Sequence, residues 1–377
     1  MSQSQALDGL IKKHRLLDDA IANNRERFPS DWDGTHPYVG RFLGPEIAAT
    51  GLIRPEHRRY LYFDDQHEIL DRIRSLHRSL EGLDLARSNI VAGSGSSSLL
   101  LALCLWLLQQ KYTEVYYIPP LYYTLHYFLK MFNIQAQPIS EKHVFESPVL
   151  SGLPPHKSVL LLCDPVWFAG FRVPLQTIET IARWQQATES LVMIDGSFQF
   201  MQWNRIRKEH SALLDPELTF RLISPTKSLA IPFFRFAYLL HPSWVHRDLV
   251  FLYENMIGGS TVADLAFARR SLEVMASEEC NFALTSYLQR TFEALIYQGV
   301  LRTRIMPDSG YFTFAVPAIQ LPHQIAMDQD YFELEGYPDH VRINLMLAQQ
   351  MYLPNLNGEI GEGQPDDKAS ASTLGVF

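Results

Sequence analysis

The chain has 377 residues, 47% of them hydrophobic, which is enough to build one large globular domain or two smaller ones. Its formal net charge of −8 and the lack of a long lysine or arginine run argue against a nucleic acid or an anionic membrane surface as the main partner. The three cysteines form no CxxC pair, so we predict neither a disulfide framework nor a metal site. A small molecule is the expected ligand.

The N-terminal residues indicate a cytoplasmic protein. They lack the basic start and apolar core of a signal peptide, and the longest apolar run, at residues 99–108, is too short to span a bilayer. Apolar residues recur at helical spacing between Leu7 and Ala22, and a connection rich in Gly and Pro follows. We therefore predict that residues 1–59 form an N-terminal arm and part of a small domain.

Residues 60–250 alternate short apolar runs with longer helical patterns, beginning with a helix at residues 66–80. The runs VLLLC (159–163) and LVMID (191–195) are apolar throughout, as expected when helices cover both faces of a parallel sheet. This pattern predicts an α/β fold whose large domain contains a mainly parallel, doubly wound sheet.

Residues 251–352 are predicted to form a smaller, reduced α+β domain. One long helical stretch, at residues 264–298, leads to the strand-like segments GYFTFAV (310–316) and HVRINLM (340–346), and we expect no helix after Arg342. Residues 353–377 are rich in Gly, Asp, Ser and Pro, which cannot bury a core, so we expect a disordered tail there.

The segment VAGSGSSSLL (91–100) is typical of a phosphate-binding turn. A strand ends in a turn of small residues that opens a helix, so backbone N–H groups, the hydroxyls of Ser96 and Ser97 and the helix dipole point to one place. The alternative is an ordinary strand-to-helix turn, because the segment has neither a Walker lysine nor the GxGxxG spacing of nucleotide-binding turns.

Asp195 ends an apolar strand, where a buried acid is costly unless a cation or a protonated ring nitrogen pairs with it. The alternative is a helix-capping or turn aspartate at the end of the strand. The identity of the partner distinguishes these two interpretations.

The segment SPTKSLAIPFFRFAYLL (224–240) places two cations, Lys227 and Arg235, beside an apolar run. A desolvated lysine has a lowered pKa, which is the condition for an imine-forming lysine, whereas most loop lysines extend to water. The arginine stays charged and requires an anion, for which a phosphate or a carboxylate is the natural candidate.

The order of these features resembles the aspartate aminotransferase superfamily, whose class I/II aminotransferase-like members have fold type I and use pyridoxal 5'-phosphate (PLP). The features are a phosphate turn, an aromatic residue after a proline, a strand-end Asp, a Lys, an Arg eight residues later and a late Arg in a strand. The most specific match is SPTKSLAIPFFRFAYLL, which is similar to the family's S-x-x-K-x7-R-x-G-Y/W block, with Ala237 where Gly is usual.

The resemblance implies a role for each matching position. Lys227 would form the covalent link to the cofactor and move the α-proton, and Asp195 would pair with the pyridinium nitrogen. Tyr122 would stack on the ring, and Arg342 would bind the substrate carboxylate, although an ordinary surface arginine is the alternative there. The phosphate would be held by Ser96, Ser97, Ser224 and Arg235.

Two positions depart from the family pattern. The family's N-P-x-N-P-T-G turn is DPVWFAG here, so Trp167 lies where an Asn normally bonds the cofactor's phenolic oxygen, and Phe198 replaces a Tyr that bonds the same oxygen. Fewer donors to this oxygen should raise the pKa of the cofactor's link to the lysine. The Asp-x-x-Phe version also resembles the branch of capreomycidine synthase and PLP-dependent arginine oxidases.

Three functions therefore remain open. The first is an aminotransferase acting on an α-amino acid. The second is a PLP-dependent cyclase, oxidase or β/γ-eliminating enzyme on arginine or a hydroxyarginine-like amino acid in specialised metabolism. The third, a non-catalytic relative, is least favoured because Asp195, Lys227 and Arg235 occur together. The resemblance also implies a homodimer with a shared active site, reached from the neighbour by Tyr60 or Tyr62 and by Ser260 or Thr261.

Overall fold

The computed structural model describes residues 66–140, 143, 145, 150–204, 207–229, 235–258, 260–318, 327–332, 334–346 and 348. The predicted N-terminal arm, Tyr60, Tyr62 and the predicted tail lie outside these residues. No helix in these ranges is long and apolar enough to cross a membrane.

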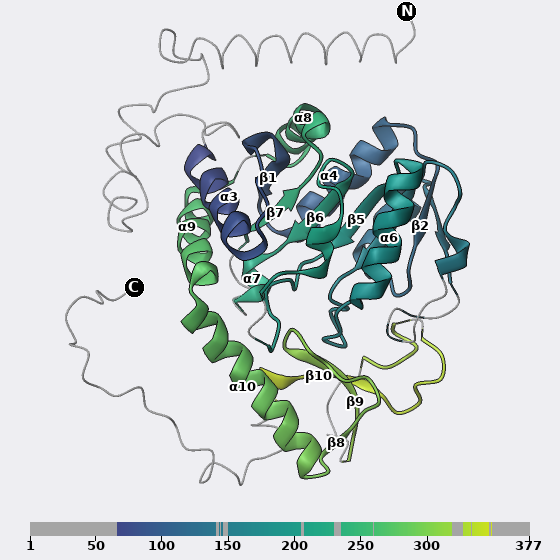
Figure 1. Ribbon diagram of the computed structural model, residues 1–377, viewed down its shortest axis with the longest axis vertical. Coiled ribbons are helices and arrows are strands. Elements are labelled where there is room, and N and C mark those ends of the chain that lie inside the picture. Colours follow the sequence, from purple (N-terminus) through teal and green to yellow (C-terminus); the bar gives the residue numbers. More distant parts are fainter. Residues whose placement is uncertain are drawn as a thin grey trace, which may run out of the picture.

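A seven-stranded sheet forms the centre of the molecule (Figure 1). Its strand order is β1-β7-β6-β5-β4-β2-β3, and the pairs among β2 to β6 are all parallel. Only β7 runs antiparallel to its neighbours β1 and β6. The mainly parallel α/β sheet predicted from the sequence is confirmed. The strands are β1 (Ile90–Gly93), β2 (Glu114–Tyr117), β3 (Gln135–Pro138), β4 (Val159–Cys163), β5 (Leu191–Asp195), β6 (Thr219–Ile223) and β7 (Ala237–Leu240).

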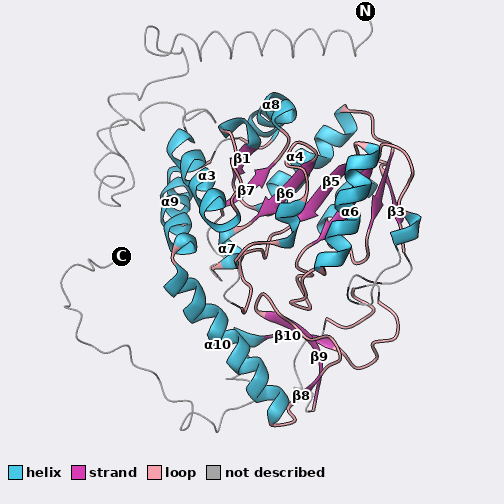
Figure 2. Ribbon diagram, viewed as in Figure 1, coloured by secondary structure: helices cyan, strands magenta, loops and turns pink. Residues whose placement is uncertain are grey.

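Helices bury both faces of this sheet, which explains why its central strands are apolar throughout. Along β4, Val159 and Leu161 belong to one buried cluster, while Leu160 and Leu162 belong to another on the opposite face. The first cluster includes side chains of α3 (His67–Glu81), α4 (Ser96–Gln109), α5 (Tyr123–Met131), α8 (His246–Met256) and α9 (Val262–Ala276). The second includes side chains of α6 (Leu175–Thr188), and Figure 2 shows the helices on the two sides.

The predicted helix at residues 264–298 is in fact two helices, α9 and α10 (Glu278–Tyr297). Ser277 between them has an extended backbone, with φ −74° and ψ 118°, and its N–H donates to the carbonyls of Glu273 and Val274. A serine followed by two glutamates, Glu278 and Glu279, is a favourable helix start, because acidic side chains stabilise the first turn. The sequence pattern alone did not reveal this break.

A three-stranded antiparallel sheet, in the order β10-β9-β8, lies beside the end of α10 (Figure 1). Its strands are β8 (Leu301–Arg302), β9 (Phe312–Pro317) and β10 (Val341–Asn344). Leu345 and Met346 are helical, which corrects the expectation of no helix after Arg342. The proposed domain limits, residues 60–250 and 251–352, stay a prediction.

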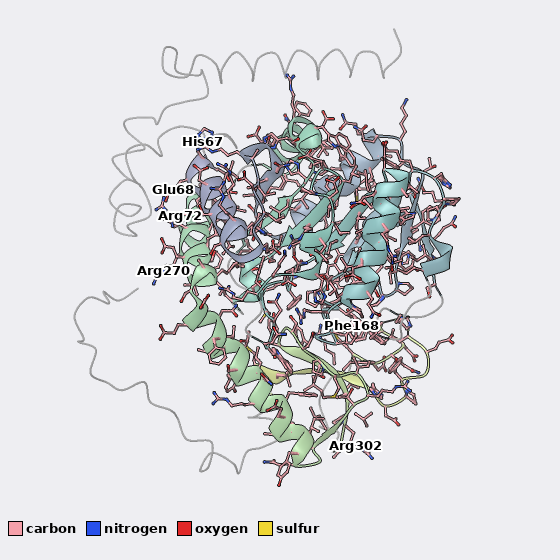
Figure 3. The ribbon with its side chains drawn as sticks, in the orientation of Figure 1. His67, Glu68, Arg72, Phe168, Arg270 and Arg302 are labelled. Atoms are coloured by element: carbon pink, nitrogen blue, oxygen red, sulfur yellow. The ribbon has the colours of Figure 1, made fainter. Side chains whose placement is uncertain are left out.

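Aromatic rings join the two sheets. Phe168, labelled in Figure 3, follows β4 and stacks on Phe332 with ring centroids 3.9 Å apart. It also meets Phe314 of β9 edge-on at 5.3 Å. This contact fixes the small sheet over the carboxyl ends of the parallel strands.

Charged side chains link helix α3 to α9 at the surface. Glu68, labelled in Figure 3 with Arg72, accepts two hydrogen bonds from Arg269, and Arg72 donates to Glu273. Exposed pairs of this kind contribute little to stability, about 0.2–1 kcal/mol each. The apolar side of α3, with Ile69, Ile73 and similar side chains in the core, therefore provides most of its attachment.

Candidate active site

The carboxyl ends of β4, β5 and β6 bring together residues that are far apart in the sequence. These three strands are adjacent and parallel, so Asp164, Asp195 and Ser224 all lie at one edge of the sheet. Such an edge is where open α/β sheets bind ligands. Lys227 follows Ser224 on α7 (Pro225–Ser228), a single helical turn.

Lys227 lies between two aromatic rings. Its Nζ is 5.4 Å from the centroid of the Tyr122 ring and 5.3 Å from that of the Phe198 ring. The side chain is half-buried. Burial lowers the pKa of this ammonium group and the charge of Arg235 lowers it further, while Asp195 acts in the opposite direction. Lys227 is therefore partly desolvated rather than fully extended into water.

Asp195 is buried, and its Oδ1 accepts a hydrogen bond of 3.1 Å from the N–H of Ser197. The aspartate thus stabilises the turn after its strand, as one of the two sequence interpretations expected. Within the described part of the chain, no cationic side chain forms an ion pair with Asp195. The turn role and a ligand role are compatible.

The predicted phosphate turn lies against the guanidinium of Arg235. Gly95, the N-cap of α4, has φ +94°, and a β-carbon there would lie 2.8 Å from Arg235 Nη2. Ser96 and Ser97 begin α4 directly after this glycine. The structure therefore brings the arginine to the N-terminus of α4, where backbone N–H groups and the helix dipole also favour an anion.

Two contacts already use polar groups of the predicted phosphate site. The N–H of Ser94 donates 2.7 Å to the hydroxyl of Tyr253, so this donor of the turn has a protein partner. The hydroxyl of Ser224 is 2.9 Å from that of Thr226, so it already has a neighbour. Arg235 itself is exposed, and no acceptor on another described residue bonds to it.

The two unusual positions, Trp167 and Phe198, form aromatic walls. Trp167 meets the Tyr122 ring edge-on, with centroids 5.2 Å apart, and Phe198 meets Tyr311 edge-on at 5.3 Å. Asp164, at the position of the family's first Asn, is buried and accepts 2.9 Å from the N–H of Val173. The residues that replace the polar family residues therefore serve packing and loop structure.

Arg342 on β10 is half-buried, with its guanidinium carbon 4.5 Å from the centroid of the Phe312 ring. Burial lowers the pKa of this arginine, although neighbouring tyrosine hydroxyls act in the opposite direction. Its strand is at the edge of the small sheet, as the surface alternative expected. The aromatic contact and the burial distinguish it from an ordinary surface arginine. In addition, no carboxylate of the described residues pairs with it.

Tyr123 was not singled out as a site residue from the sequence. Its ring lies 4.7 Å from that of Tyr122. A hydrogen bond with Tyr122 lowers the pKa of Tyr123, and the charges of Lys227 and Arg342 lower it further. Tyr123 is therefore close enough to both predicted cationic residues of the site for their charges to affect it. Only the doubled tyrosine in PPLYY pointed to it.

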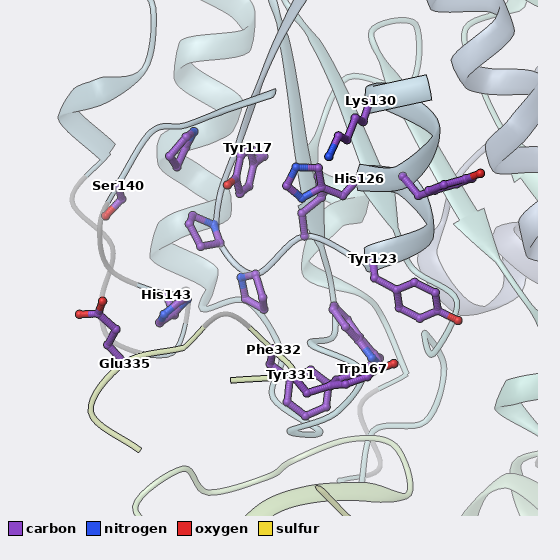
Figure 4. A pocket seen from close by; sticks show the side chains of 15 residues that line it. Tyr117, Tyr123, His126, Lys130, Ser140, His143, Trp167, Tyr331, Phe332 and Glu335 are labelled. Atoms are coloured by element: carbon purple, nitrogen blue, oxygen red, sulfur yellow. The ribbon is translucent and has the colours of Figure 1, made fainter. Parts of the chain in front are cut away.

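A cavity of about 640 Å³ opens next to these residues (Figure 4). Tyr123, His126 and Lys130, all on α5, line one side of it, and Trp167 also borders it. Further lining side chains are those of Tyr117, Tyr127, Ser140, His143, Tyr331, Phe332 and Glu335. The cavity is mainly aromatic and carries both signs of charge, so it suits a bulky ligand with a polar end.

Several solved structures with a similar fold are aminotransferases. A probable N-succinyldiaminopimelate aminotransferase from Thermus thermophilus is 18% identical, with a TM-score of 0.66 over 90% of this chain and 97% of that chain. An Escherichia coli protein with a methionine aminotransferase function is 15% identical, with a TM-score of 0.62 over 84% and 86%. A Thermus thermophilus aspartate aminotransferase mutant is 14% identical, with a TM-score of 0.61 over 92% of each chain.

Identities this low establish the fold alone, and no curated protein matches the sequence. The model of one family, Aminotransferase class I and II, matches residues 52–277, which is more than half of the chain. The protein is thus an aminotransferase-like enzyme that depends on PLP, and it belongs to the class I and II aminotransferase family.

Proposed function

We propose that this enzyme transfers the amino group of an α-amino acid and that Lys227 is its catalytic residue. The observation that carries this proposal is the position of Lys227 Nζ. It lies near the rings of Tyr122 and Phe198, at the carboxyl ends of the parallel strands, where Asp195 also lies. A lysine with a lowered pKa has a larger fraction of the neutral amine, which is the nucleophilic and basic form.

The groups around Lys227 fit PLP. A dianionic phosphate requires a cation and a helix N-terminus. Arg235 lies against Gly95 at the start of α4, and Ser96 and Ser97 directly follow this glycine. Ser224 directly follows β6. A pyridinium nitrogen requires a carboxylate, and Asp195 is buried at the end of β5. The phosphate and the ring nitrogen of PLP are thus each matched by a different side chain, Arg235 and Asp195.

Bound PLP supplies an electron sink that acidifies the α-carbon proton of an amino acid. Lys227 Nζ would hold the cofactor and would move the α-proton of the substrate. The Asp195 carboxylate would hold the proton of the ring nitrogen. The rings of Tyr122 and Phe198 shield Nζ from water, Trp167 packs on Tyr122, and a drier site would strengthen these electrostatic contacts.

Arg342 is proposed to bind the substrate carboxylate. Its guanidinium packs on Phe312, which orients the planar group, and an oriented guanidinium can bind a carboxylate with two parallel hydrogen bonds. The side chain of the amino acid would then extend toward the aromatic cavity lined by Trp167 and Tyr123.

A second candidate keeps PLP and α-carbon deprotonation but leads to cyclisation, oxidation or β/γ-elimination on arginine or a hydroxyarginine-like amino acid. Two features favour it: Phe198 in place of the family's tyrosine, and a cavity that combines several aromatic rings with the carboxylate of Glu335. Aromatic faces and a carboxylate both attract a guanidinium.

We also propose a cytoplasmic homodimer. Thr261 caps α9, accepting 3.1 Å from the N–H of Asp264, so its hydroxyl serves its own helix. Ser260 is the remaining candidate of the two, since its hydroxyl has no hydrogen-bond partner among the described residues. Light scattering on the purified protein tests this assembly, and a monomer at micromolar concentration would contradict it.

The visible spectrum tests the proposed function. We expect the purified protein with PLP to absorb at about 410–430 nm, as lysine-bound PLP does, and Lys227→Ala to lose this band. A panel of amino acids then separates the candidates. Conversion to the amine form of the cofactor with release of a keto acid supports amino-group transfer, whereas ammonia release or oxygen consumption with arginine supports the second candidate.

A further inference from the structure

A network of buried polar side chains lies behind the candidate active site. Arg221 of β6 donates from Nη1 and Nη2 to the two carboxylate oxygens of Glu81 on α3, at 3.0 and 2.9 Å. His77 of the same helix is 2.6 Å from Glu81 and 3.0 Å from the hydroxyl of Tyr238. These four side chains are buried and join α3 to the centre of the sheet.

Gln199 connects this network to the site. Arg221 Nη2 donates 2.8 Å to Gln199 Oε1, and Gln199 Nε2 donates 3.0 Å to the hydroxyl of Ser211. Both hydrogen-bonding atoms of the amide therefore have partners. The side chain is fully buried. The orientation of Gln199 is consequently fixed from both ends.

Gln199 contacts the turn that carries Asp195. Its N–H donates 2.8 Å to the carbonyl of Gly196, the residue after the aspartate. Its side chain also packs on that glycine, because a β-carbon at Gly196 would lie 2.6 Å from Gln199 Cδ. The main chain of Gln199 thus bonds the segment directly after Asp195, and its side chain packs against that segment.

Gln199 also contacts the turn that carries Lys227. The hydroxyl of Ser228, the residue after the lysine, donates a hydrogen bond of 2.9 Å to the main-chain carbonyl of Gln199. It also lies 3.3 Å from the main-chain carbonyl of Ser224. One residue thus joins the two chain segments that bear the predicted acid and the predicted lysine.

The charges of the network balance locally. Burial alone would raise the pKa of Glu81, but Arg221 and His77 lower it to about 2, so the Glu81–Arg221 pair is ionised and its net charge is zero. Burial also lowers the pKa of His77, which favours the neutral ring. The network therefore affects the site through the positions of its side chains rather than through the electric field of a net charge.

We propose that Gln199 is a positioning residue that fixes Asp195 relative to Lys227, held in turn by Arg221. This inference rests on the proposed function of Lys227 and Asp195. A cofactor bonded to Lys227 has its ring nitrogen at a set distance from that bond. A shift of the Asp195 turn would therefore weaken the carboxylate contact and lower the affinity for PLP.

Gln199→Met tests this proposal, and Gln185→Met is its matched control. Gln185 is another fully buried glutamine whose amide is bonded at both ends, to Leu218, Thr219 and Asp215, but it contacts neither turn. We expect both variants to lower the melting temperature to a similar extent. Only Gln199→Met should raise the Kd for PLP, by about tenfold. Only this variant should also shift the pH at which the visible band of the bound cofactor is half-titrated, its pH midpoint.

A smaller change protects the test against misfolding. Ser228→Ala removes one bond to the Gln199 carbonyl, and we expect a shift of the pH midpoint in the same direction but of smaller size. If both variants keep the wild-type midpoint and PLP affinity while only their stability falls, Gln199 has a structural role and the proposal is wrong. If instead the wild-type protein lacks the band, or Lys227→Ala keeps it, the proposed function itself fails.

Discussion

The guanidinium of Arg235 rests on Gly95: a β-carbon at this glycine would lie 2.8 Å from Nη2 and 3.0 Å from Cζ. The two residues are 140 positions apart, one at the start of α4 and the other just before β7. The contact defines a site where an arginine and a helix N-terminus meet, and it requires a residue without a side chain.

Gly95→Ala should therefore weaken PLP binding. The new methyl group would displace the guanidinium, and a backbone with φ +94° strains any residue other than glycine by about 1–3 kcal/mol. Gly82→Ala is the control, because Gly82 also has a positive φ, +73°, but has open space around it. Titration of the apoprotein with PLP should show a higher Kd for Gly95→Ala alone. Equal affinities of the two variants would mean that the contact does not serve the phosphate.

Glu209 should make the folded state less stable as the pH rises. It is fully buried, and burial together with the charge of Asp164 raises its pKa from 4.5 to about 8. The folded chain therefore holds this proton more tightly than the unfolded chain. The stabilisation is complete below the unfolded value and is lost as the pH approaches 8, with a slope of about 1.4 kcal/mol per pH unit.

Glu209→Gln should remove that slope, because the amide preserves the shape of the neutral acid. Urea unfolding at several pH values between the two pKa values measures it. Glu217→Gln is the opposite control: hydrogen bonds from Ser243 and Asn89 lower the pKa of Glu217 despite its burial, so its loss should destabilise the protein at neutral pH. A wild-type slope that persists in Glu209→Gln would show that other groups cause it.

Arg342→Lys should raise KM for the amino acid by about tenfold or more while changing kcat less. Lysine keeps the charge but loses the planar fork that binds a carboxylate through two bonds. Arg302→Lys, on the exposed side of β8 in the same small sheet, should leave KM unchanged. Steady-state kinetics separate the two. If the KM values of both variants equal the wild-type value, Arg342 does not bind the substrate.

Phe198→Tyr should lower the pH midpoint of the visible band. The Phe198 ring is 5.3 Å from Lys227 Nζ, so a hydroxyl added to it would bring a donor toward the cofactor's link to the lysine. Trp167→Asn should act in the same direction, and the double variant should show the larger shift. Spectra recorded across a pH series test this, and a midpoint that rises would contradict the assignment of these two positions.

The sheet was predictable because its central strands are simple in the sequence. VLLLC and LVMID form β4 and β5 with the predicted limits, since each strand is buried on both faces and needs only apolar residues. The order of Asp195, Lys227 and Arg235 along the chain suggested a shared site, and the structure brings Asp195 and the turn of Lys227 to the ends of adjacent parallel strands, while their roles stay a prediction.

The remainder depends on contacts between distant segments, which a single sequence does not reveal. The pairing of Glu81 with Arg221 joins residues 140 positions apart, and the approach of Arg235 to Gly95 is similar. The break at Ser277 depends on a single residue within an otherwise helical pattern. The side chains that line the aromatic cavity come from segments that connect strands of the large sheet and of the small sheet. The size of the cavity therefore depends on how these segments fold together.

Reduction with borohydride followed by peptide mass spectrometry tests directly whether Lys227 carries the cofactor. Reduction makes the bond between PLP and its lysine permanent, so the modified peptide identifies that lysine. We expect a single pyridoxyl phosphate group on Lys227, with none in Lys227→Ala. A label on another lysine, or a protein that carries no label after incubation with PLP, would contradict it.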